Sequence, residues 1–100
     1  MTIEQINELQ DQYGYLQMQR LIDSGEVWKF EGSMGRSAMS CLEGGMCYLP
    51  EKQTFDYYGN ILPARTELEP GTKGTLENAE KFWQAVEDEE IFLGIEEEEY

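Results

Sequence analysis

The chain has 100 residues, with 21 acidic and 7 basic side chains, no histidine and a formal net charge of −14. This length and an apolar content of 40% suffice for one compact core. The charge opposes direct binding to nucleic acid or to an anionic membrane, because both are dense arrays of negative charge.

The N-terminal region predicts a helix. Thr2 and Gln5 form a capping-box pattern, and apolar residues recur at steps of three and four over residues 3–22. Gly14 is expected to bend this helix and Gly25 to end it.

The next segments predict two strands around a second helix. EVWKFE, residues 26–31, alternates, with Trp28 and Phe30 on one side, as a half-buried strand requires. GRSAMSCLEGG, residues 35–45, predicts a short helix that its glycine pair closes. MCYLP, residues 46–50, predicts a second strand.

A β-hairpin is predicted for KQTFDYYGNILPAR, residues 52–65. Two β-prone runs flank Gly59 and Asn60, a dipeptide that suits a tight turn. Pro63 lacks a backbone donor, so the second arm is expected at a sheet edge.

Thr75 predicts the start of a C-terminal helix, after which IFLGI, residues 91–95, predicts a closing strand. Within that helix, Ala79 is expected to face inward together with the larger side chains of Phe82, Trp83 and Val86. The large apolar residues expected in the core are Trp28, Phe30, Leu42, Phe82, Trp83 and Val86.

These elements predict an α+β fold, with a small, mostly antiparallel sheet packed against an N-terminal helix, a short middle helix and a C-terminal helix. Residues 1–94 are expected to form a single compact domain. Residues 95–100 are expected to be a disordered acidic tail, because four successive glutamates repel one another.

We expect a soluble, cytoplasmic protein. No apolar run approaches the roughly 18 to 20 residues that cross a bilayer, and the N-terminus lacks the regions of a secretory signal. Cys41 and Cys47 are the only cysteines, and in a reducing compartment both are expected to be buried thiols rather than a disulfide or redox pair.

Two glycine loops of similar form, GSMG and GTKG, each precede a predicted helix and each has a nearby cation. Backbone N–H groups at a helix start, a cation and glycines are what a phosphate site needs, although G-x-x-G is more often ordinary turn chemistry. The candidate anion-binding residues are Gly32, Ser33, Gly35, Arg36 and Ser37 in one loop, and Gly71, Thr72, Lys73, Gly74 and Thr75 in the other.

Catalysis has little support, and we expect a protein that is not an enzyme. Without histidine the chain lacks Ser–His and Cys–His nucleophile pairs and any His-containing metal site. The glutamate runs lack the alternating ligand spacing of an EF-hand loop. We therefore expect no catalytic residues, no metal site and no cofactor.

The acidic residues are concentrated at the C-terminal end, where residues 76–100 hold ten acids and one lysine. Acids three and four apart on a helix stand about 5 to 6 Å apart at Cβ, a spacing comparable to that of backbone phosphates. Such a helix can imitate a nucleic-acid strand, or its acids can serve solubility alone. The candidate partner-binding residues are Glu77, Glu80, Glu87, Asp88, Glu89 and Glu90.

The runs GSMGRSAMSCLEGGMCYLP and DYYGNILPARTELEPGTKGT, with the FW pair, resemble small open reading frames of bacteriophages and mobile elements. In size and acidity the chain resembles phage anti-defence inhibitors, such as anti-CRISPR and DNA-mimic proteins. That resemblance implies a protein that binds and blocks.

The sequence thus favours a non-enzymatic acidic inhibitor that occupies a basic, nucleic-acid-binding surface of another protein. One alternative is a binder of a nucleotide or other small anion at the two glycine loops. Another alternative is a structural or assembly subunit.

Overall fold

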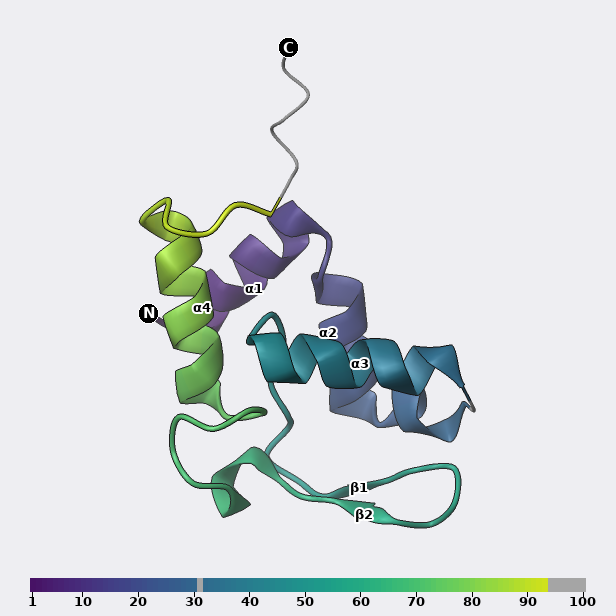
Figure 1. The fold of residues 1–100 in the computed structure, drawn as a ribbon. Coiled ribbons are helices and arrows are strands. Elements are labelled where there is room, and N and C mark those ends of the chain that lie inside the picture. The colour runs from purple at the N-terminus through teal and green to yellow at the C-terminus, as the bar shows by residue number, and fades with distance from the viewer. Residues whose placement is uncertain (31, 94–100) are drawn as a thin grey trace.

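The computed structural model describes residues 1–30 and 32–93. The α+β class is confirmed, with four α-helices and a two-stranded antiparallel sheet among the described residues (Figure 1). The elements in chain order are α1 (Ile3–Tyr13), α2 (Leu16–Ser24), the 3₁₀ helix η1 (Glu26–Lys29), α3 (Ser33–Gly44), β1 (Thr54–Phe55), β2 (Ile61–Leu62), the 3₁₀ helix η2 (Arg65–Glu67) and α4 (Leu76–Glu87).

The first predicted helix is divided in two. The capping box is confirmed, since the Gln5 N–H donates to Thr2 Oγ1 at 3.1 Å and the Thr2 N–H donates to Gln5 Oε1 at 2.7 Å. Gly14 has a φ of 89°, a left-handed conformation that ends α1 rather than bending it. Gly25, with a φ of 83°, ends α2 as predicted.

The strand predicted over residues 26–31 is wrong. The segment starts with the 3₁₀ helix η1, because the Trp28 N–H turns back to the Gly25 carbonyl at 3.2 Å. Val27 and Trp28 are adjacent and both buried, whereas neighbouring residues of a strand point to opposite faces. Phe30 is 56% exposed, so its predicted place in the core is also wrong.

The strand predicted over residues 46–50 is wrong as well. Residues 47–50 are buried, but side chains of α1 and α2 make hydrogen bonds to backbone groups of the segment. Gln10 Nε2 donates to the Met46 carbonyl at 2.9 Å, and Gln19 bonds to the backbone of Tyr48. A neighbouring strand is therefore not needed to satisfy this backbone.

The hairpin prediction is confirmed. Thr54 pairs with Leu62 and Phe55 with Ile61. Thr54 is buried, whereas the opposite face of the sheet carries the exposed Phe55 and Ile61. The hairpin extends beside α3 and its turn lies toward the N-terminal end of that helix (Figure 1).

Two apolar clusters form the core. One joins α2, η1 and α3, and the other joins α1, Tyr48 and α4. In α4, Thr75 caps the helix as predicted, Trp83 is completely buried and Phe82 is partly buried. The predicted burial of Trp28, Leu42, Trp83 and Val86 is confirmed.

Residues 91–93 form no strand, because the described residues offer no neighbouring strand to pair with them. Ile91 and Leu93 instead pack against the cluster that contains α1 and α4. The rest of the predicted closing strand and the predicted tail over residues 95–100 lie outside the described residues.

Candidate functional site

The strongest candidate surface is an acidic turn, Glu87–Glu90, that ends α4. It has the hydrogen bonds of a Schellman motif: the Glu90 N–H donates to the Ala85 carbonyl at 2.8 Å, and the Glu89 N–H to the Val86 carbonyl at 3.0 Å. All four acidic residues are exposed. These bonds define the backbone conformation of four consecutive acidic residues at a helix end.

Glu89 occupies the position of this motif at which glycine is usual. Its φ is 63°, and it is the one non-glycine residue with a positive φ in the described part of the chain. A left-handed conformation costs a residue with a side chain about 1 kcal/mol. The chain therefore keeps a carboxylate at a position where glycine would relieve strain.

The acidic turn borders a cleft of about 420 Å³ between the ends of α1 and α4. Ile91 and Leu93 are partly buried and pack against the core cluster, whereas Phe92 between them is 73% exposed. The lining residues are Gln12, Tyr13, Val86, Glu89, Ile91, Phe92 and Leu93. A carboxylate and aromatic rings thus lie around the same opening.

The electrostatics of this end of the molecule favour cations. The cleft is lined by Tyr13, the last residue of α1, and by Glu89 in the turn after α4. The C-terminal ends of the two helices lie toward the same end of the molecule (Figure 1). A helix C-terminus carries a partial negative charge, and neither helix has a basic residue in its last turn. The helix ends and the acidic turn therefore add their negative potentials.

The six predicted partner-binding residues do not form one cluster. Glu77 and Glu80 lie in the first half of α4, and Glu77 is seven residues before Gln84 and ten before Glu87. Ten residues of helix span about 15 Å. Glu77 also lies in the first turn, where a carboxylate stabilises the helix dipole, so it has a structural role of its own.

The two glycine loops lie at opposite ends of α3 and do not form a shared site. Gly32, with a φ of 88°, precedes the helix, and Ser33, Gly35, Arg36 and Ser37 lie in its first turns. Arg36 lines a cavity of about 210 Å³ with aromatic rings and the Asp56 carboxylate.

The second loop makes structural contacts. Lys73 pairs with Glu43, near the C-terminal end of α3, at 3.5 Å. The Gly74 carbonyl accepts from the Leu49 N–H at 2.9 Å, and Thr75 Oγ1 caps α4. Gly71 and Thr72 complete the turn before that cap.

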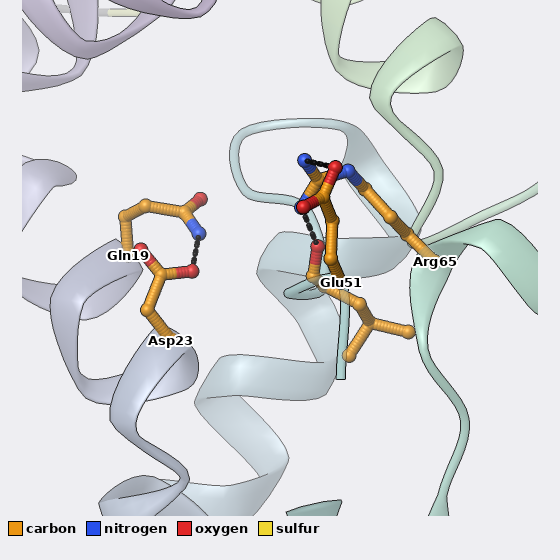
Figure 2. Close-up of polar contacts among 5 residues, drawn as sticks. Gln19, Asp23, Glu51 and Arg65 are labelled. Carbon is orange, nitrogen blue, oxygen red and sulfur yellow. Dashed lines mark hydrogen bonds and ion pairs between the residues drawn. The ribbon is translucent and has the colours of Figure 1, made fainter. Parts of the chain in front are cut away.

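Arg65 is another cation with a structural role. Its Nη1 donates to the Leu49 carbonyl at 2.9 Å, and its Nη2 lies 3.3 Å from Glu51 (Figure 2). In the same view Gln19 Nε2 donates to Asp23 at 2.8 Å. Burial raises the pKa of Asp23, while the bond from Gln19 and the charge of Arg65 oppose the rise.

Sequence reasoning identified the acids of the turn but missed the cleft beside it. The apolar spacing over residues 3–22, which includes Tyr13, predicts a helix face that packs on the core, and the strand predicted over residues 91–95 includes Phe92. The alternation of Ile91, Phe92 and Leu93 did contain a signal, because it places one aromatic ring opposite two inward side chains.

Within residues 1–30 and 32–93, no group of three or more Cys, Asp or Glu side chains is placed to hold a metal ion. In the same part of the chain no helix combines the length and apolar character needed to cross a bilayer. Both cysteines are buried and free, as predicted. Comparisons with protein-family models, curated proteins and solved structures gave no match to the chain.

Proposed function

We propose that this protein is a non-enzymatic inhibitor that docks its acidic turn on a basic, nucleic-acid-binding surface of a partner protein. The observation that carries the proposal is Glu89, a carboxylate kept in a strained left-handed conformation beside the cleft. Strained backbone conformations cluster at functional sites, so this outlier supports a role for the Glu89 side chain. Acids that serve solubility alone need no such position.

The charge distribution supports binding to a cationic groove. The net charge of −14 steers the protein toward basic surfaces and away from phosphate. The acidic turn and the two helix C-termini place the local negative potential at one end of the molecule. A partner that binds this end has its basic groove occupied and cannot hold nucleic acid there, which is the mode that the resemblance to phage anti-defence inhibitors implies.

The first test removes charge without changing shape. The partner is captured from a cell lysate on the immobilised wild-type protein, then purified, and its affinity is measured for two quadruple variants. The acidic-turn variant carries Glu87→Gln, Asp88→Asn, Glu89→Gln and Glu90→Gln. A control with the same net charge carries exposed replacements elsewhere: Glu4→Gln, Glu26→Gln, Glu43→Gln and Glu69→Gln.

The acidic-turn variant should lose at least about tenfold in affinity, since several charge-assisted contacts are removed at about 1.5 kcal/mol or more each. The control should change affinity far less, and DNA should displace the wild-type protein from the partner. Equal losses in the two variants, or a ternary complex with DNA, would contradict the proposal.

Glu89→Gly separates function from stability. Glycine relieves the left-handed strain, so the free energy of unfolding should stay constant or rise by up to about 1 kcal/mol. The same variant should bind the partner more weakly. A variant that is more stable and binds as tightly as wild type would show that Glu89 has no role in binding.

A nucleotide or similar anion at the start of α3 is the second candidate function. The observation that favours it is the cavity that Arg36 shares with Phe30, Tyr57 and Tyr58, which places aromatic rings and a cation together. Calorimetry with a nucleotide panel tests it. Arg36→Gln should weaken any binding and the exposed control Arg20→Gln should not, and a panel that gives no heat would remove this candidate.

A further inference from the structure

A second cavity, of about 290 Å³, lies between α3, β2 and the loop before α4. Leu42 and Leu49 form its buried apolar part, and Met39, Leu62 and Leu68 form its partly buried walls. None of its lining residues also lines the cleft beside the acidic turn. Nothing in the proposed inhibitor function uses it.

Lys73 is the one charged side chain that lines this cavity among the described residues. Its side chain is 60% exposed, and its Nζ lies 3.5 Å from Glu43, which is 55% exposed. An exposed ion pair of this kind contributes little to stability. The ammonium group can therefore exchange Glu43 for another carboxylate at little cost.

We infer that the cavity binds an amphipathic anion, a medium-chain fatty acid, with its acyl chain among the leucines and its carboxylate on Lys73. The apolar walls favour a hydrocarbon chain, and the lone cation at the exposed edge favours an anionic head group. A cavity of about 150 Å³ holds benzene, which has six carbon atoms. A volume of about 290 Å³ thus suits about ten to twelve non-hydrogen atoms, the size of octanoate or decanoate.

The charges around the site predict whether each substitution strengthens or weakens octanoate binding. Glu43 competes for Lys73 and repels an incoming carboxylate, so Glu43→Gln should strengthen octanoate binding. Lys73→Gln should weaken it by about tenfold, since a charge-assisted contact is lost. Lys81 is an exposed lysine of α4 that does not line the cavity, so Lys81→Gln is the matched control.

The probes are octanoate, octan-1-ol, octylamine and butanoate, added to the full chain below their aggregation concentrations. Methyl NMR shifts locate binding and their titration gives affinity. Octanoate should perturb the methyl groups of Leu49, Leu62 and Leu68 and bind more tightly than octan-1-ol, with octylamine weakest. Affinity should rise by roughly fourfold for each methylene between butanoate and octanoate, at about 0.8 kcal/mol per buried methylene.

Lys73→Gln should leave octan-1-ol binding unchanged, which separates loss of the head-group contact from damage to the cavity. The inference is overturned if millimolar octanoate leaves these methyl groups unshifted, if octylamine binds as tightly as octanoate, or if Lys81→Gln weakens octanoate as much as Lys73→Gln. None of these results depends on the inhibitor proposal, because no partner protein is present.

Discussion

The side-chain amide of Gln19 bonds to both backbone groups of Tyr48. Gln19 Oε1 accepts from the Tyr48 N–H at 3.0 Å, and Gln19 Nε2 donates to the Tyr48 carbonyl at 2.9 Å. This pair of bonds is what a residue on a neighbouring antiparallel strand would provide. Gln19 is 1% exposed and Tyr48 is 4% exposed, so water is a poor substitute for either bond.

Gln19→Ala should therefore lower the free energy of unfolding by about 2 to 4 kcal/mol, because each buried polar group left without a partner costs about 1 to 3 kcal/mol. Urea unfolding measures the loss. Gln17 is an exposed glutamine on the same helix, and Gln17→Ala should change the free energy by less than about 0.5 kcal/mol. Similar losses in the two variants would show that the Gln19–Tyr48 bonds contribute little.

The parts of the fold that the sequence predicted are those that local chemistry specifies. Thr2 and Thr75 cap helices, Gly25 and Gly45 end them in left-handed conformations, and Gly59 allows the hairpin turn. Each of these signals acts over a few residues. Each signal can therefore be recognised in the sequence without knowledge of the rest of the fold.

The strand prediction over residues 46–50 failed because its outcome depended on distant residues. Residues 47–50 are buried, but Gln10 and Gln19 make the hydrogen bonds that a neighbouring strand would otherwise make. Both glutamines lie on helices, 36 and 29 residues away in the sequence from the groups that they bond. The periodicity of the sequence does not predict such side-chain-to-backbone bonds.

The candidate surface was predictable in its charge and not in its shape. Glu87–Glu90 is a run of four acidic residues, which can be read directly from the sequence. The left-handed Glu89 follows from the Schellman bonds at the helix end, a position where the sequence offers no glycine. The cleft requires the segment after α4 to return to the end of α1, which is a tertiary contact.

Two aromatic residues that the sequence predicts for the core differ in their burial. Trp83 is fully buried and its Nε1 donates to the Met46 carbonyl at 3.1 Å, whereas Phe30 is 56% exposed. Trp83→Ala should lower the free energy of unfolding by about 3 to 5 kcal/mol. Phe30→Ala should lower it by less than about 1 kcal/mol. Chemical unfolding of both variants checks this, and a loss for Phe30→Ala as large as that for Trp83→Ala would place Phe30 in the core.

The two thiols should be protected in the folded protein. Cys47 is fully buried and Cys41 is 8% exposed. The hydrogen bond between the two thiols raises the pKa of Cys47, as burial also does, and lowers the pKa of Cys41. Because the thiolate is the reactive form, Cys47 is protected by protonation as well as by burial, whereas Cys41 is protected by burial alone. At pH 8, a disulfide reagent such as dithionitrobenzoate should modify neither thiol of the native protein rapidly. Both should react in denaturant, and fast reaction of two thiols without denaturant would contradict their burial.

The hairpin turn should respond to acid through Asp56. Desolvation acts to raise the pKa of this carboxyl, but bonds from the Asn60 backbone and side chain and from the Tyr58 and Gly59 N–H groups outweigh it and hold the pKa below its ordinary value. A depressed folded pKa means that the carboxylate stabilises the turn above the unfolded pKa of about 3.9, and that this stabilisation is lost as the pH falls through the folded pKa.

Carboxyl NMR should therefore show Asp56 titrating below 3.9, with the Tyr58 and Asn60 amide shifts moving at the same pH. Asp56→Asn keeps the shape of the side chain and should abolish that pH response, whereas a wild-type carboxyl that titrates above 3.9 would mean that the turn gains nothing from the charge.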